Sequence, residues 1–283
     1  MRHSHYYYIY RMTDTLHNKY ISVTPDGVIT ALEALRNDEQ RQVLMQFFKT
    51  GPGEYGEGDE FLGLRVPQTR RVAELFAGLP PEQVPHLLAS KWHEARLCGL
   101  LIWVKHFERL SKNKLIDNEN AMAQRDRIIN LYIEHAERAN NWDLVDLSAP
   151  KIMGRWLLLP TALGGSPPGM HLEHKVAVLD ELAASDNLWR QRIGMVCTWT
   201  TTHQGDPRWC LRYAERHLNH PHDLMHKAVG WMLREMGKCV SENLLREFLQ
   251  HNIRRIHATT LRYAIERLPG HERQQWLALR RQG

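Results

Sequence analysis

The sequence predicts an all-α protein, folded as an α-solenoid of stacked antiparallel helix pairs with a concave, basic groove. Three observations support this prediction. Apolar residues recur at spacings of three and four along most of the 283 residues, no two segments alternate as paired strands do, and several helical segments resemble one another. A repeated helical unit stacks on its neighbours, so we expect one continuous array of helices.

The apolar periodicity places expected helices along almost the whole chain. Residues suited to a first helical turn support several of the starts, namely Pro81, Asp206 before Pro207, and Ser241 before Glu242. The expected helical segments are residues 31–48, 81–89, 94–110, 124–139, 174–185, 207–218, 226–236, 241–250 and 259–268.

Two stretches interrupt the helical pattern. Residues 49–67 are rich in glycine and acidic residues, and residues 159–170 are rich in glycine and proline, so both are predicted to be loops. The first stretch has few basic residues and no GKS or GKT ending. It therefore does not match the phosphate-binding loop of an NTPase.

Two helical segments share a pattern that indicates an internal repeat. Arg96 is followed seven residues later by Trp103, and Arg192 is followed seven residues later by Trp199. Similar helices begin near Met225 and Ile256, at intervals of about 30 to 40 residues, the size of a helix pair in an α-solenoid. The interval predicts pairs of the HEAT kind, in which residues of the inner helices line a groove wide enough for a polymer.

The length allows one large core or two modest ones, and the repeated helices predict a single repeat domain over residues 12–283. The leader at residues 1–11 is expected to be disordered or to reflect a start assigned too early. The chain is 43% hydrophobic and 24% charged, and it contains no run of 18 apolar residues that could cross a membrane. We expect a cytoplasmic monomer that does not bind a membrane.

The positive charge is concentrated in the last third of the chain. Residues 187–283 contain 16 Lys and Arg against 8 Asp and Glu, whereas residues 1–186 contain 21 against 24. Such an imbalance suits a polyanionic partner, because phosphate contacts dominate the affinity of proteins for nucleic acid. The alternative is a set of solvated helix faces.

The cysteines and histidines do not follow a regular metal-binding pattern. The cysteines lack a CxxC spacing and are expected to be reduced core thiols, at Cys98, Cys197, Cys210 and Cys239. One segment gathers histidines at His217, His220, His222 and His226. Because Pro221 interrupts it and no cysteine or acidic ligand completes a regular metal-binding pattern, we expect a loop between helices there and no metal site.

The segment NNWDLVD, residues 140–146, has an unusual helical face. Trp142 and Asp146 are four residues apart, so on a helix their side chains lie one above the other, while Asp143 points elsewhere. The preceding amides are suited to start a helix, and Asp143 is suited to its first turn. A stripe that only packed on the core would be aliphatic, so the indole and the carboxylate indicate a partner outside the core. The alternative is a core tryptophan beside a solvated or capping aspartate.

Four stretches carry characteristic residues in a fixed order. They are FLGLRVPQTRRVAELF (61–76), NNWDLVD (140–146), SDNLWRQRIGM (185–195) and HKAVGWMLREMGK (226–238). Together they resemble the AlkD-type DNA alkylation repair glycosylases, which are HEAT-like repeat proteins, over roughly Val28 to Leu268. The resemblance implies excision of positively charged alkylpurines, such as 7-methylguanine and 3-methyladenine, from duplex DNA without a protein pocket for the base. It implies neither a metal nor a nucleotide cofactor.

The resemblance also assigns the residues of an active cleft. Trp142 and Asp146 correspond to its aromatic and carboxylate, Arg192 to the basic partner, and Trp231 to the second aromatic. A further aromatic, usually a tyrosine, falls at or near Phe47, which keeps a stacking surface but lacks the hydroxyl.

Other residues of the same stretches have two interpretations. Four cations either follow DNA phosphates or belong to solvated faces, namely Arg190, Lys227, Arg234 and Lys238. The remaining tryptophans of the apolar stripes are expected to lie in the core, namely Trp103, Trp189, Trp199 and Trp209.

The chemistry of a cationic leaving group explains these residue types. An alkylpurine that already carries a positive charge does not need an acid, so an ionised carboxylate that stabilises the sugar cation and delivers water suffices. We expect the helix dipole and Arg192 to hold the pKa of Asp146 low, and Arg192 to bind a phosphate. Two other classes remain open: a HEAT-type DNA-binding scaffold without catalysis, and a protein-binding solenoid, which the basic C-terminal third disfavours.

Overall fold

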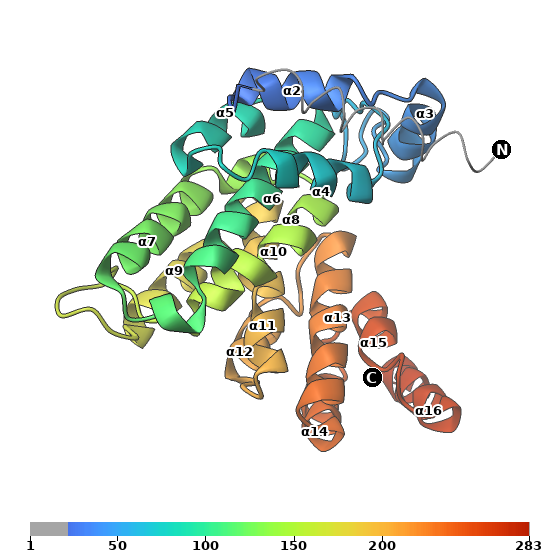
Figure 1. Ribbon diagram of the computed structural model, residues 1–283. Coiled ribbons are helices and arrows are strands. Elements are labelled where there is room, and N and C mark those ends of the chain that lie inside the picture. The colour runs from blue at the N-terminus through green and yellow to red at the C-terminus, as the bar shows by residue number, and fades with distance from the viewer. Residues whose placement is uncertain (1–21, 283) are drawn as a thin grey trace. The chain divides into compact units, whose positions relative to one another are not determined.

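A computed structural model describes residues 22–282 (Figure 1), and in them it confirms the all-α prediction. Helices follow one another along this part of the chain, and its β-type pairing is limited to isolated bridges at Glu60–Trp92 and Thr161–Gly169. The leader predicted at residues 1–11 lies outside the described residues. In the part of the chain that the structure describes, no helix is both long enough and apolar enough to cross a bilayer.

The chain divides into two compact units, residues 1–102 and residues 103–283. The helix α6 (His93–Leu110) contains the point of division. The single domain over residues 12–283 stays a prediction beside this division.

In the first unit, short helices precede and follow the glycine-rich loop. The elements are α2 (Pro25–Glu33), α3 (Asp38–Phe47), α4 (Val66–Leu75), η1 (Pro81–Gln83) and α5 (Val84–Leu88). The segment predicted as one helical stretch, residues 31–48, is broken between α2 and α3, because the side chain of Asn37 accepts from the backbone N–H of Gln40 and starts a new helix.

The loop predicted at residues 49–67 is confirmed over most of its length, since helix α4 begins at Val66. Gly63 adopts φ +90°, a conformation that other residues rarely reach. A Cβ at this position would lie 2.0 Å from the carbonyl oxygen of Asn37, so the close approach of the loop to the start of α3 requires glycine.

The second unit contains the remaining helices. They are η2 (Asn113–Leu115), α7 (Glu119–Glu134), η3 (Ala136–Arg138), α8 (Trp142–Ser148), η4 (Pro150–Gly154), α9 (Leu172–Ala184), α10 (Leu188–Val196), α11 (Thr198–His203), α12 (Arg208–Arg216), α13 (Asp223–Cys239), α14 (Glu242–Asn252), α15 (Ala258–Ala264) and α16 (Gly270–Gln282). The predicted loop at 159–170 lies between η4 and α9. The predicted start at Ser241 is confirmed, because its hydroxyl accepts from the N–H of Leu244.

Helices of the second unit pack in two layers, as in an α-solenoid. In one layer α8 contacts α10, α10 contacts α13, and α13 contacts α15. Helices of the other layer pack on these, with α9 against α10, α12 and α14 against α13, and α16 against α15. Figure 1 shows α13 and α15 side by side. The contacts agree with the predicted stacking, whereas the concave groove stays a prediction.

Buried side chains of the second unit test the predicted core. Trp103, Trp189 and Trp209 are buried, as predicted. Trp199 is only half-buried and lines a surface cavity, so its assignment to the core was wrong. Three cysteines are buried, but Cys239 is exposed at the end of α13, which corrects the prediction of four core thiols.

Candidate functional site

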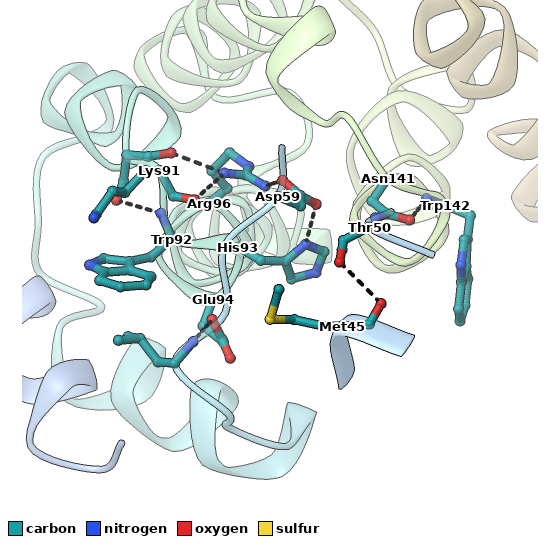
Figure 2. Close-up of polar contacts among 12 residues, drawn as sticks. Met45, Thr50, Asp59, Lys91, Trp92, His93, Glu94, Arg96, Asn141 and Trp142 are labelled. Atoms are coloured by element: carbon teal, nitrogen blue, oxygen red, sulfur yellow. Dashed lines mark hydrogen bonds and ion pairs between the residues drawn. The ribbon is translucent and has the colours of Figure 1, made fainter. Parts of the chain in front are cut away.

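Helix α8 presents the predicted face of NNWDLVD. Its N-cap is Asn141, whose side-chain oxygen accepts from the N–H of Trp142 at 2.8 Å (Figure 2). Trp142 and Asp146 are both half-buried, while the residues between them, 143–145, are buried. The indole and the carboxylate therefore share the more exposed face of α8, one helical turn apart.

Asp146 is held by a bidentate ion pair. Nε of Arg192 donates to Oδ1 of Asp146 at 3.0 Å, and Nη2 donates to Oδ2 at 2.9 Å. The remaining nitrogen, Nη1, donates to the backbone carbonyl of Leu224 at 2.6 Å. Since these residues lie on α8, α10 and α13, one guanidinium connects three successive helices of the same layer.

The surroundings of Arg192 do not match the phosphate contact that was expected for it. Its side chain is only 5% exposed, and every guanidinium nitrogen donates to Asp146 or to Leu224. A buried guanidinium whose three nitrogens all have partners within the protein is poorly placed to bind a phosphate. Arg192 instead fixes the orientation of the carboxylate, which is the role of a positioning residue.

The pKa of Asp146 also differs from expectation. Burial raises the pKa of this carboxyl above its ordinary value, and the neighbouring Asp143 adds to the rise, while the charge and hydrogen bonds of Arg192 oppose it. The low pKa expected from the helix dipole and Arg192 was therefore wrong in direction, because desolvation of the carboxylate outweighs both. The Asp146 side chain nevertheless remains 18% exposed, so a ligand or water can reach it.

Helix α13 contributes a stripe of cations around an aromatic ring. Between Leu224 and Lys238 the residues of α13 that are not buried are Lys227, Trp231, Arg234 and Lys238. Their spacings of four, three and four place them on one face of the helix. The resemblance assigned Trp231 to the active cleft, and the three cations were predicted either to follow phosphates or to belong to a solvated face. The structure places all four on one surface, called the α13 stripe below.

Most of the residues that were predicted to contact phosphates form ion pairs within the protein. Lys227 pairs with Asp223 at 2.8 Å, and Arg234 pairs with Glu266. Arg190 donates to Glu181 at 3.1 Å and to the carbonyl of Ile133 at 3.2 Å. Such pairs reduce the charge that each residue offers to DNA. Lys238 is exposed.

Phe47 belongs to the first unit and ends helix α3. Its side chain is 60% exposed, and its ring meets that of Phe48 edge-on at 5.1 Å. Phe48 stacks on Phe61, so Phe47 is the exposed end of an aromatic cluster. An exposed ring fits the stacking surface assigned from the resemblance, and the assignment stays a prediction.

A buried polar network in the first unit was not predicted from the sequence. Asp59 accepts from Arg96 and from Nδ1 of His93, and Glu94 accepts from the backbone N–H of Leu62 at 2.9 Å (Figure 2). All three side chains at 93, 94 and 96 are buried, so the network holds the loop against α6. The sequence signal that could have revealed this network was the shared pattern of Arg96 and Arg192, since each arginine binds a carboxylate.

The histidine-rich segment forms caps and hydrogen bonds. The ring of His222 accepts from the N–H of Leu224 and caps α13, and the ring of His220 accepts from the N–H of His222. Nε2 of His220 contacts the amide of Gln191 at 2.7 Å. These histidines therefore secure the turn that presents the Leu224 carbonyl to Arg192.

Comparisons with known proteins agree on one family description. The family model described as DNA alkylation repair enzyme matches residues 28–268. Among solved structures, a predicted DNA alkylation repair enzyme from Enterococcus faecalis is similar, with a TM-score of 0.58 and 14% identity over 83% of this chain and 97% of that chain. At this identity the likeness concerns the fold alone. No curated protein sequence matches the chain at a significant level.

Proposed function

Since the chain belongs to the DNA alkylation repair enzyme family, we propose that it is a DNA glycosylase that removes N3- and N7-alkylated purines from duplex DNA. The family indicates a role in alkylation repair, with DNA as the substrate. The proposal adds the reaction, hydrolysis of the N-glycosidic bond, and the substrate class, purines that carry a positive charge.

The observation that supports the reaction most strongly is the bidentate pair of Asp146 and Arg192 beside Trp142. Each carboxylate oxygen offers about two lone-pair directions, and Arg192 uses one on each oxygen. The Asp146 side chain is 18% exposed, and the remaining directions are proposed to face the substrate. A carboxylate that is oriented in advance and partly desolvated interacts more strongly with a developing cation than one in bulk water.

In the proposed step, water attacks C1′ of the nucleotide. The oxygen of water bonds to C1′ while the bond from C1′ to the purine nitrogen breaks, and the electron pair leaves with the purine, which becomes neutral. The water proton passes to solvent through Asp146, which also stabilises the positive charge of the sugar in the transition state. No general acid is needed, because the purine already carries a positive charge and becomes neutral when it accepts the electron pair.

The α13 stripe supports DNA as the ligand of the same surface. Trp231 and Lys238 lie on one helix face, so an aromatic ring lies near an exposed cation that can attract a phosphate. The ring of Trp231 is proposed to contact the deoxyribose or the cationic base, an attraction of about 0.5 to 2 kcal/mol for a well-placed ring. Phe47 is proposed as a further stacking surface.

One assay tests the proposal directly. Purified protein is incubated with a duplex that contains a single 7-methylguanine, and alkali then reveals an abasic site as a strand break. We expect strand breaks that depend on the protein and are absent from the undamaged duplex. Duplex binding without base release would support the alternative function, a DNA-binding scaffold without catalysis, and would refute the glycosylase.

A further inference from the structure

Helices α11 and α13 bring together three side chains that commonly bind metals. A nitrogen of His203, a carboxylate oxygen of Glu235 and the sulfur of Cys239 all lie within 4.8 Å of one another. We propose that these three residues bind one zinc ion. The site would join the C-terminal end of α11 to the C-terminal half of α13, which is how metal sites form between the facing helices of bundles.

The hydrogen bond of His203 fixes which ring nitrogen is free for a metal. Nδ1 lies 2.8 Å from the carbonyl oxygen of Trp199, and a carbonyl only accepts, so Nδ1 carries the proton. Nε2 then faces Oε2 of Glu235 at 3.5 Å. Nε2 and the carboxylate oxygen therefore face each other, as two ligands of one metal ion do. Donation from the other ring nitrogen to a backbone carbonyl is also the usual feature of a zinc-bound histidine.

The separation of these atoms suits tetrahedral coordination. Zinc–nitrogen and zinc–oxygen bonds of about 2.0 to 2.2 Å place neighbouring ligand atoms about 3.3 to 3.6 Å apart. The observed 3.5 Å between Nε2 of His203 and Oε2 of Glu235 lies in this range. This distance is longer than that of a direct charge-assisted hydrogen bond, which is about 2.7 to 2.9 Å. Cys239 follows Glu235 by four residues on α13, so its sulfur lies on the same helix face and completes the set.

Glu235 is a buried carboxylate, which needs a partner. Its side chain is only 8% exposed, and buried charges in proteins are paired or coordinate metals. Nε of Arg234 lies 3.5 Å from Oε1, the oxygen that does not face His203, and makes no hydrogen bond to it. His203 and Cys239 are the last residues of their helices, where the helix dipole favours a cation.

The donor set selects the metal. One thiolate, one imidazole and one carboxylate suit zinc, whereas magnesium and calcium prefer oxygen ligands alone. Three protein ligands leave one position, which water can fill because Cys239 is exposed. Binding requires the thiolate, so the thiol proton of Cys239 is released to solvent and the affinity rises with pH. The ion would act as a clip between α11 and α13.

The test uses tag-free full-length protein and metal ions alone. Zinc affinity is measured by competition with a chromophoric chelator, and cobalt(II) replaces zinc as a spectroscopic probe. We expect one ion per chain, visible cobalt bands of tetrahedral intensity, and a thiolate-to-cobalt charge-transfer band. Cys239→Ser, a change at an exposed position that should not disturb the core, is expected to abolish the charge-transfer band and to weaken zinc binding about tenfold or more.

A matched control separates this site from general binding by histidines. His251→Gln removes an exposed histidine of α14 and should leave the zinc affinity and the cobalt spectrum unchanged. His203→Gln should weaken zinc binding as strongly as Cys239→Ser does. Absence of saturable binding to the unaltered protein, or binding that Cys239→Ser leaves unchanged, would overturn the proposal. Because no DNA is present, the result is independent of glycosylase activity.

Discussion

Arg192 binds both carboxylate oxygens of Asp146, at 3.0 and 2.9 Å, and uses its last nitrogen to bind the carbonyl of Leu224 at 2.6 Å. The carboxylate on α8 is therefore oriented by a residue on α10, which is itself anchored to α13. This relationship gives different roles to two residues that the resemblance placed together in the active cleft. Asp146 is proposed to act on the substrate, and Arg192 to position Asp146.

Asp146→Asn should abolish most of the excision and leave duplex binding nearly unchanged. The amide lacks the negative charge that stabilises the transition state, so we expect the single-turnover rate to fall about 10- to 1000-fold. The change also leaves Arg192 without its charged partner, so the free energy of unfolding should fall by about 1 to 3 kcal/mol. Rates and binding are measured well below the melting temperature of the variant.

Asp180→Asn is the matched control for Asp146→Asn. Asp180 accepts from Arg212 at 2.7 Å on the surface of α9, so the variant also removes a carboxylate from an arginine pair. Its excision rate should equal that of the unaltered protein. Full activity in Asp146→Asn would remove this carboxylate from the mechanism.

Arg192→Lys should reduce excision without changing how binding depends on salt. An ammonium cannot reach both oxygens of Asp146 and the carbonyl of Leu224 together, so the carboxylate loses its fixed orientation. Because the guanidinium is buried, the variant should lose no phosphate contact. We expect a lower single-turnover rate and an unchanged slope of log affinity against log salt. A flatter slope would show that Arg192 contacts a phosphate after all.

Lys238→Ala should give the opposite result. The lysine is exposed at the end of the α13 stripe, and a single phosphate contact contributes about 0.9 to the salt slope. We expect weaker duplex binding and a slope that is smaller by about one, with a similar excision rate at saturating protein. Lys112→Ala, an exposed lysine that lies outside α13, serves as the control and should change neither quantity.

Lys175 should make stability depend on pH in the alkaline range. Its ammonium is buried and donates to the carbonyl of Leu159 at 2.6 Å, and burial lowers its pKa from 10.5 to about 8. Between these values the unfolded chain binds a proton that the folded chain does not, so the free energy of unfolding rises with pH. Below about pH 8 both states bind the proton, and this contribution is lost.

Replacement of Lys175 by methionine tests this dependence. Chemical denaturation of Lys175→Met between pH 7 and pH 10.5 should give a flatter curve of stability against pH than the unaltered chain does. Lys112→Met should keep the original curve. An equal rise in all three proteins would assign the pH dependence to other groups.

Local features were predictable from the sequence because they depend on neighbouring residues. The shared face of Trp142 and Asp146 and the cap at Ser241 follow from helical spacing and from the chemistry of a first turn. The α13 stripe was predicted as separate residues, and their spacing on one helix makes them a single surface. The two-layer stacking also follows, since the amphipathic segments repeat along the chain.

Features that depend on distant residues were not predictable. The partner that completes Arg192 is a backbone carbonyl, at Leu224, which no residue type reveals. The direction of the Asp146 pKa shift depends on how much water the surrounding helices exclude, and the sequence shows the opposing charge of Arg192 but not that burial. The exposure of Cys239 was likewise not predictable, because this cysteine is the last residue of a helix whose apolar residues are mostly buried.

The charge of the leaving base provides the most direct measurement of the proposed function. Single-turnover release is compared in duplexes that are identical except for the lesion, with 7-methylguanine or 3-methyladenine against the neutral bases hypoxanthine and 1,N6-ethenoadenine. Because the proposed step uses no acid to protonate the leaving base, assistance by Asp146 alone should suffice only for a base that already carries a positive charge. We predict rapid release of the cationic purines, no release of the neutral ones, and loss of the difference in Asp146→Asn. Rapid release of hypoxanthine with slow release of the cationic purines would contradict the proposed mechanism and the roles of Asp146 and Arg192 in it.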